Sequence, residues 1–380
     1  MAKRRRSVCR SWRAATQDPR FVRRHLQLSR AGPPSVLDVP CEPRLEDYWS
    51  QARSKELEFR RVSPGGGDPT PPPVRAELML AVEWSAGGVT ALGDPVHCDG
   101  IVLVPTAPGE LFLSNKATRE FAALPPGSPS VVVNVSVAFG FDPWTGTYKV
   151  ARCFYRRFDF VDDAGGCGGY DYDVGHEVLT LGVGTWEPTE DPPYAVVPRR
   201  PICTPGAFYY TALVASADDP RRPSELLCFR TRDETFDVVP NPPCFSGGVI
   251  GDRDELTELG SRLCCAHARA PAAVDIWLST DHHDDDDLEW SVAYRVELLR
   301  PVKEFVLPLA VSADGDEVLL SVDRRVLYKF NAKKRALEIV VDMQRVPDLY
   351  GPPKPELPLR FLHHAVPYVE SLVSIHRRNY

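Results

Sequence analysis

Short apolar runs, separated by turn-forming residues, recur from about residue 76 to the C-terminus. Runs of this length predict β-strands. Examples are Leu78–Val82, Ile101–Val104, Leu111–Ser114, Tyr148–Phe154, Phe208–Leu213, Leu226–Phe229 and Val326–Phe330. No convincing amphipathic helix pattern lies between them, so the spacing favours antiparallel meanders over parallel βαβ units.

A weak internal repeat groups these strands. Its copies run from Cys98 to Pro125, from Gly206 to Pro240 and, in a degenerate form, from Asp316 to Val340. Each copy is a strand, a second strand, a polar turn and a third strand. Units of about 40 to 50 residues with this content are typical of propeller blades, which bury their faces only against neighbouring blades. We predict a mainly β fold, a β-propeller of about six blades, with five or seven left open.

Two short helices are predicted before the strands. The first is indicated by apolar residues at helical spacing, Val8, Trp12 and Ala15. In the second, Asp18 suits the N-cap and Pro19 the first helical position. Its apolar residues are Phe21, Val22 and Leu26. We expect a helical segment at 1–30, a linker with a Pro- and Gly-rich loop at 31–75, and the propeller at 76–380.

Composition and charge narrow the classes of function. The 37 prolines argue against long helices, and the formal net charge of −7 gives no electrostatic case for binding nucleic acid. No stretch approaches the roughly 18 apolar residues of a membrane span. The basic residues at the start are not followed by the apolar region of a signal peptide. The ten cysteines contain no CxxC pair. We expect no nucleic-acid or membrane partner, and a cytoplasmic and/or nuclear protein.

The sequence offers few candidates for chemistry. His282–Asp287 is rich in metal-ligating side chains, but a consecutive charged run between two strands is more typical of a solvated hairpin loop. Gly165–Gly169 lacks the Lys-Ser/Thr of a phosphate-binding loop, and His176–Glu177 is an isolated pair. No GxSxG or HExxH motif occurs. We therefore expect no catalytic residue, no metal and no cofactor.

Trp144 is a candidate contact with a substrate protein. Asp142–Pro143 begins a tight turn that Gly146 can complete, and Trp144 lies at its tip. A large aromatic side chain there either packs on a neighbouring blade or is available to a partner.

Five segments occur in an order that points to a known family. They are Val8–Ala14 with Asp18–Val22, Cys98–Gly100, Asn115–Phe121, Ala138–Pro143 and Leu226–Phe236. In this order they resemble plant F-box proteins with a type 3, kelch-like F-box-associated β-propeller. Those proteins carry "VCKSWR … DPxF" at the end of the F-box, followed by "CDGL", "NPATREF", "xFGFDP … YKV" and "LxFDxxxExF".

The resemblance implies a substrate-recognition adaptor of an SCF-type E3 ubiquitin ligase. The F-box remnant would pack on a Skp1-like protein in a cullin complex, and the propeller would bind an unknown protein substrate. The residues nominated for the Skp1-like partner are Val8, Trp12, Phe21 and Leu26. Ubiquitin transfer would occur on the associated conjugating enzyme, so this chain is not expected to be an enzyme.

Two departures from the family pattern qualify this interpretation. The "LPxDLLxEIL"-like helix that opens family F-boxes is not found ahead of Val8, so we expect an F-box truncated at its N-terminus. The asparagine-proline of the third motif is Asn115–Lys116 here.

One alternative function is a stand-alone propeller interaction module without ligase recruitment. A propeller hydrolase is a weaker alternative, since no motif supports it.

Overall fold

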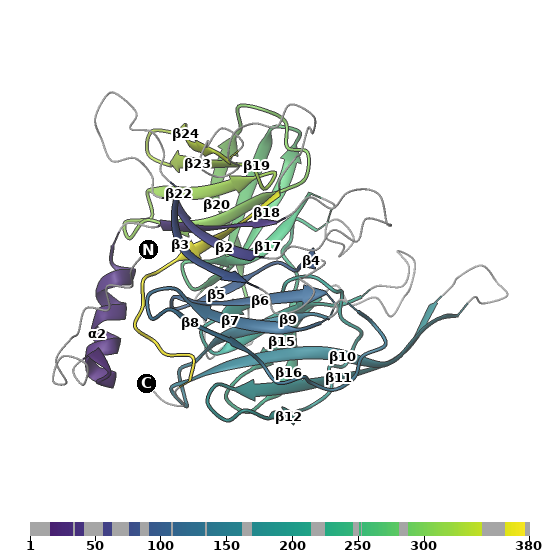
Figure 1. The fold of residues 1–380 in the computed structure, drawn as a ribbon. Coiled ribbons are helices and arrows are strands. Elements are labelled where there is room, and N and C mark those ends of the chain that lie inside the picture. The colour runs from purple at the N-terminus through teal and green to yellow at the C-terminus, as the bar shows by residue number, and fades with distance from the viewer. Residues whose placement is uncertain are drawn as a thin grey trace, which may run out of the picture.

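The computed structural model describes residues 16–32, 35–41, 56–62, 76–83, 91–107, 109–133, 135–161, 169–213, 225–245, 251, 253–280, 288–343 and 362–376. Most of the described secondary structure is β-strand, and helix α2 (Pro19–Arg30) precedes it (Figure 1). The helical part of the described chain contains no segment both long and apolar enough to span a bilayer.

The described strands form six antiparallel sheets, which we number as blades 1 to 6. Blade 1 consists of β25 (Leu362–Tyr368), β1 (Ser35–Cys41), β2 (Glu56–Val62) and β3 (Ala76–Glu83). Blade 2 consists of β4 (Ala91–Leu92), β5 (Val96–Cys98), β6 (Ile101–Ala107), β7 (Leu111–Asn115) and β8 (Glu120–Ala123). Blade 3 consists of β9 (Val137–Asp142), β10 (Thr147–Val161), β11 (Gly169–Thr180) and β12 (Trp186–Pro188).

The remaining blades repeat this arrangement. Blade 4 consists of β13 (Ile202–Thr204), β14 (Ala207–Thr211), β15 (Glu225–Arg230) and β16 (Thr235–Pro240). Blade 5 consists of β17 (Glu255–Leu259), β18 (Arg262–Ala270), β19 (Ala273–Ser279) and β20 (Trp290–Glu297). Blade 6 consists of β21 (Val306–Val311), β22 (Glu317–Val322), β23 (Val326–Asn331) and β24 (Ala336–Asp342).

The innermost strands connect the blades into a ring. Contacts run from β25 to β5, β9, β13, β17 and β21 in turn, and β21 contacts β25 again. The predicted mainly β propeller is thereby confirmed, with six blades in the described chain.

Blade 1 closes the ring by joining the two ends of the chain. β25 pairs with β1 in register from Ser35↔Tyr368 to Cys41↔Leu362, so the last strand completes a sheet that the first strands begin. The boundary predicted at residue 76 is wrong on this point. β1 and β2 fall within the expected linker 31–75, yet both are strands of blade 1. The Pro- and Gly-rich loop between them and β3 lies outside the described residues.

Apolar clusters fill the spaces between neighbouring blades. Blades 3 and 4 share one that includes Phe208 and Phe229, both fully buried. Gly140 of β9 allows this close approach, because a Cβ built there would lie 2.7 Å from Cε1 of Phe208. The glycine in the "FGF" segment therefore belongs to the interface between two blades.

Helix α2 forms as its sequence predicts. The Oδ1 of Asp18 accepts a hydrogen bond from the backbone N–H of Arg20 at 2.7 Å, and Pro19 occupies the first turn. Val22 and Leu26 are buried in the cluster shared with blades 2 and 3. The helix is thus a packed part of the molecule. The first predicted helix, with Val8, Trp12 and Ala15, lies outside the described residues.

Candidate functional site

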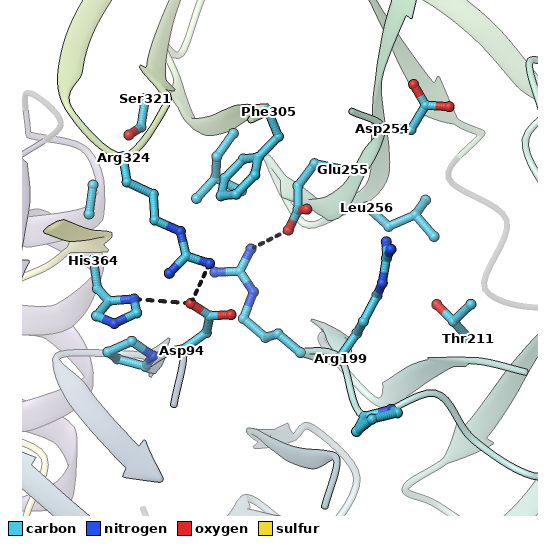
Figure 2. Close-up of a pocket in the computed structure, with 15 residues that line it drawn as sticks. Asp94, Arg199, Thr211, Asp254, Glu255, Leu256, Phe305, Ser321, Arg324 and His364 are labelled. Carbon is cyan, nitrogen blue, oxygen red and sulfur yellow. Dashed lines mark ion pairs between the residues drawn. The ribbon is translucent and has the colours of Figure 1, made fainter. Parts of the chain in front are cut away.

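A cavity of about 270 Å³ opens on the propeller axis, at the end where the innermost strands begin (Figure 2). Residues at or just before the starts of β5, β13, β17, β21 and β25 contribute to its walls. Its charged lining residues are Asp94, Arg199, Arg200, Asp254, Glu255, Arg324 and His364. Because separate blades supply these residues, the cavity requires the closed ring.

Asp94 is the centre of the charge network in this axial cavity. Its Oδ1 lies 3.0 Å from Nδ1 of His364 and 3.3 Å from Nη2 of Arg324. Burial by itself would raise the pKa of Asp94, but the hydrogen bond from His364 and the charges of His364, Arg324 and Arg200 outweigh burial and hold that pKa well below its usual range. Asp94 is therefore a carboxylate at neutral pH and holds the side chains of His364 and Arg324 in place.

A second, looser pair lies across the cavity. Nη2 of Arg200 is 3.7 Å from Oε1 of Glu255. Burial raises the pKa of Glu255, and Arg200 opposes that rise. Arg199, next in the chain, is exposed, and no carboxylate in the described part of the chain pairs with it. The cavity therefore presents both positively and negatively charged side chains. Such a mixed lining suits the polar groups of a bound chain better than a ligand with a strong charge of one sign.

Of the three candidates for chemistry in the sequence, the structure describes one. His176 is fully buried, with Nδ1 2.6 Å from Oγ1 of Thr189, and burial lowers its pKa to about 3. Oε1 of Glu177 lies 2.6 Å from Nε of Arg152. His176 also packs on Tyr210 and Phe229 of blade 4, whereas the ion pair of Glu177 lies within blade 3, so both residues serve the packing of the propeller. The glycine run, apart from Gly169, and the His282–Asp287 run lie outside the described residues. Within the described ranges no group of three His, Cys, Asp or Glu side chains is placed to hold a metal ion.

The other end of the axis carries α2. Arg30, at the end of α2, donates from Nε to Oδ1 of Asp99 at 3.1 Å, and the hydroxyl of Tyr148 donates to Oδ2 of Asp99 at 2.9 Å. Asp99 and Gly100 form the turn that follows β5, both with positive φ. Since Asp94 precedes β5 and Asp99 follows it, the axial cavity and α2 lie at opposite ends of this strand.

The C-terminal segment after β25 lies at the same end as α2. Nδ2 of Asn115 donates to the backbone oxygens of Ser371 and Val373, at 3.0 and 2.6 Å. Glu120 accepts a hydrogen bond from the N–H of Ile375 at 2.9 Å. A Cβ on Gly100 would lie 2.7 Å from the oxygen of Val369, so the turn needs glycine there for the segment to pass. These motif residues hold the end of the chain against blade 2.

Trp144 also lies at the α2 end, in the turn after β9. Its side chain is 59% exposed, and the guanidinium of Arg232 lies 4.5 Å from its ring centroid. Buried Lys149 anchors the turn, since its Nζ lies 3.2 Å from Oδ2 of Asp142 and donates to the oxygen of Thr231 at 2.6 Å. Trp144 is thus both an exposed aromatic and a contact between blades 3 and 4. It is remote from the axial cavity.

The nominated partner-binding residues on α2 separate into two groups. Leu26 is 8% exposed and packs on the propeller, whereas Phe21 is 43% exposed. Burial removes Leu26 from the accessible surface of α2, where the leucine that is exposed is Leu28. Leu28 is 59% exposed and lies seven residues from Phe21, on the same helical face. Val8 and Trp12 lie outside the described residues.

The F-box associated beta propeller domain matches residues 91–347, more than half of the chain. The chain belongs to the F-box associated β-propeller family. The matched region extends from β4 to just beyond β24, so it takes in the blades that carry most of the motifs discussed above.

Curated relatives in this family come from Arabidopsis thaliana. The chain is 25% identical to the F-box protein CPR1 over 263 residues, which are 63% of this chain and 61% of CPR1. It is 26% identical to the F-box/kelch-repeat protein At2g43445 over 249 residues, which are 61% of this chain and 54% of that protein. The matches therefore span little more than half the length of these relatives.

A solved structure with a similar arrangement is oligogalacturonate lyase in complex with manganese. The TM-score is 0.41 at 13% identity, and the comparison covers 80% of this chain and 78% of the lyase.

Sequence reasoning did not find the axial cavity of this F-box associated propeller. Its residues come from short stretches of one to three residues that lie far apart in the chain, so no motif spacing links them. A usable signal was the recurrence of charged residues immediately before short strands, as in Arg199–Arg200 before β13 and Asp254 before β17.

Proposed function

We propose that this chain is the substrate-recognition adaptor of an SCF-type E3 ubiquitin ligase. In this proposal α2 belongs to the part that contacts a Skp1-like protein of a cullin complex, and the end with the axial cavity holds the protein to be modified. The chain catalyses nothing itself. It raises the rate of ubiquitin transfer by holding the substrate near the conjugating enzyme. Membership of the F-box associated β-propeller family supports this role.

The observation that carries the proposal is the way α2 is seated. Val22 and Leu26 bury one face of the helix in the propeller, and Arg30 is held by Asp99. Another face of the helix presents Phe21 and Leu28 to solvent. An adaptor needs such a fixed connection, because a helix on a flexible tether would not set the distance between its partner and a substrate at the far end.

The test is co-purification of the full chain with a Skp1-like protein. We expect a stoichiometric complex from the unmodified chain. Replacing Phe21→Ala and Leu28→Ala together should weaken capture about tenfold or more, as expected for loss of exposed apolar anchors. The matched control is Ile339→Ala in β24, a residue that is 50% exposed in blade 6.

The result distinguishes the adaptor from its main alternative. If the unmodified chain folds but captures no Skp1-like protein, the stand-alone interaction module is correct and the adaptor is not. Equal capture by the double variant and by Ile339→Ala would remove α2 from the contact. Circular dichroism and the urea midpoint of each variant establish that folding is unchanged.

A further inference from the structure

The hairpin of β10 and β11 extends beyond the rest of blade 3. Pairing of β10 with β9 stops at Arg152, and pairing of β11 with β12 stops at Glu177. The two strands continue to pair with each other as far as Val161↔Gly169. We call residues 157–161 and 169–173 the arm. Figure 1 shows β10 and β11 projecting away from the other blades, on the side opposite α2.

One face of the arm is aromatic. Phe158 pairs with Tyr172 and Phe160 with Tyr170, so the four rings share a face. The ring centroids of Phe158 and Tyr170 are 5.0 Å apart, and those of Phe160 and Tyr170 are 5.6 Å apart. Phe160 is 64% exposed. Phe158 and Tyr172 pack on the apolar cluster shared by blades 3 and 4, so the uncovered part of the row is Phe160 at its outer end. Exposed aromatic area of this kind is the usual anchor of an interface.

The opposite face is acidic. Asp159 stands directly across from Asp171, an arrangement that like charges disfavour. Arg157 lies 2.8 Å from Oδ1 of Asp171, and among the described residues no cation pairs with Asp159. At the base of the arm, Nη1 of Arg156 holds both Asp173 and Asp191, at 2.8 and 3.0 Å. Ion pairs therefore hold the carboxylates at the base of this face in place, whereas Asp159, nearer the end of the arm, is not neutralised by a cation among the described residues.

The outer edge of β10 is able to accept another strand. The chain already uses this edge at the base of the arm, where the N–H of Val131 donates to the oxygen of Tyr155 at 2.9 Å and the N–H of Tyr155 donates to Oγ of Ser130 at 3.1 Å. Beyond Tyr155, β11 is the pairing partner of β10 in the described part of the chain. An unpaired edge of this kind adds an extended peptide through main-chain hydrogen bonds.

We propose that the arm binds an extended segment of a protein as an additional strand along β10, and that this segment alternates bulky apolar with basic side chains. A strand added there continues both faces of the arm. Its apolar residues cover Phe158 and Phe160, and its Lys or Arg residues meet Asp159 and Asp171. The acidic face repels phosphate, which disfavours nucleic acid and anionic membranes as occupants. The inference rests on the proposed function, since it names the class of substrate segment that the adaptor holds.

The first experiment titrates the full chain with a fluorescent peptide of about ten residues in which Lys and Val alternate, the length that spans a strand of this size. A peptide alternating Glu and Val is the charge control. We expect the Lys peptide to bind about tenfold more tightly or better, with an advantage that shrinks at high salt. Hydrogen exchange should slow at the backbone amides of the arm when it binds.

Variants locate the site. Asp159→Lys should weaken binding of the Lys peptide about tenfold, so that its affinity becomes similar to that of the Glu peptide. Phe160→Ser should weaken the binding of both peptides. The control is Trp144→Ser, which removes an exposed aromatic at the other end of the axis. Equal binding of the two peptides, or protection outside the arm, would overturn the proposal. So would a dimer of the unmodified chain that Phe160→Ser dissociates, since the arm would then pair with a second copy.

Capture of the Skp1-like protein separates this inference from the proposed function. The arm variants should retain that capture, because the arm is remote from α2. If the unmodified chain captures the Skp1-like protein but binds no peptide, the proposal for the arm fails and the adaptor role stands. If the unmodified chain captures no Skp1-like protein, the adaptor role fails.

Discussion

Lys116 places an amine in the interior, at the position where the family motif has proline. Its side chain is 3% exposed, and Nζ lies 4.0 Å from the ring centroid of Phe59. Nζ has no hydrogen-bond partner among the described residues. Burial lowers the pKa of Lys116 well below its ordinary value.

We expect Lys116→Met to stabilise the protein. The substitution keeps most of the volume and removes a buried polar group that lacks a partner, which is worth about 1–3 kcal/mol in the free energy of unfolding. The pKa in the folded state lies below that of the unfolded chain, so the unmodified protein gains stability as pH rises between the two values. The advantage of Lys116→Met should therefore be larger at pH 7 than at pH 10.

Urea denaturation at the two pH values measures this difference. Lys329→Met, which changes a half-buried lysine that lies within 3.7 Å of Glu317, is the control. A loss of stability in Lys116→Met, or an advantage that does not shrink at pH 10, would show that the ring of Phe59 or an unmeasured partner compensates the charge.

Three residues with positive φ mark the same turn in each copy of the internal repeat. Arg119, Glu234 and Arg335 have φ of 59°, 60° and 50°, and each stands in the polar turn between the last two strands of its blade. The three copies of the repeat correspond to β6–β8, β14–β16 and β22–β24, the outer strands of blades 2, 4 and 6. Alternating burial and turn residues are clear in such strands, so periodicity finds them.

The innermost strands escaped the same reasoning. β5 and β13 are three residues each, too short for a periodic pattern, although they form the wall of the axis. β1 and β2 fall within the expected linker because the sequence around them is rich in proline and glycine, and because β25, the partner of β1, lies at the other end of the chain. Long-range pairing of this kind leaves no local signal.

Helix α2 offers a matched pair of substitutions. Leu26 is buried against the propeller, whereas Leu28 is 59% exposed. We expect Leu26→Ala to lower stability by about 2–3 kcal/mol through loss of buried apolar surface and an incompletely filled cavity. Leu28→Ala should change it by less than about 0.5 kcal/mol.

Hydrogen exchange and urea denaturation distinguish the roles of these two leucines. Leu26→Ala should accelerate exchange of the α2 amides, and Leu28→Ala should leave them protected while weakening capture of the Skp1-like protein. If the two variants exchange at the same rate, α2 is not held by the packing of Leu26.

Closure of the ring makes the axial cavity a property of the whole molecule. Asp94 in blade 2 meets His364 of blade 1 and Arg324 of blade 6, so the cavity requires β25 to be in place beside β1. The sequence could therefore predict blades but not their common site. In a ring, unlike an open array of repeats, loss of one blade exposes two interfaces and leaves no capped end.

This coupling predicts that damage to blade 1 is felt across the ring. Val366 in β25 is 2% exposed and packs with Leu37 and Phe59. Val366→Asp buries a carboxylate without a partner, which should cost about 3–5 kcal/mol. If the blades unfold as one unit, amides of β14 in blade 4, across the ring, should lose protection together with those of β1. Val238→Asp on β16, where the side chain is 41% exposed, should leave both strands protected. Faster exchange confined to blade 1 would mean that the remaining blades hold together without closure, and the axial cavity would then depend on β25 alone.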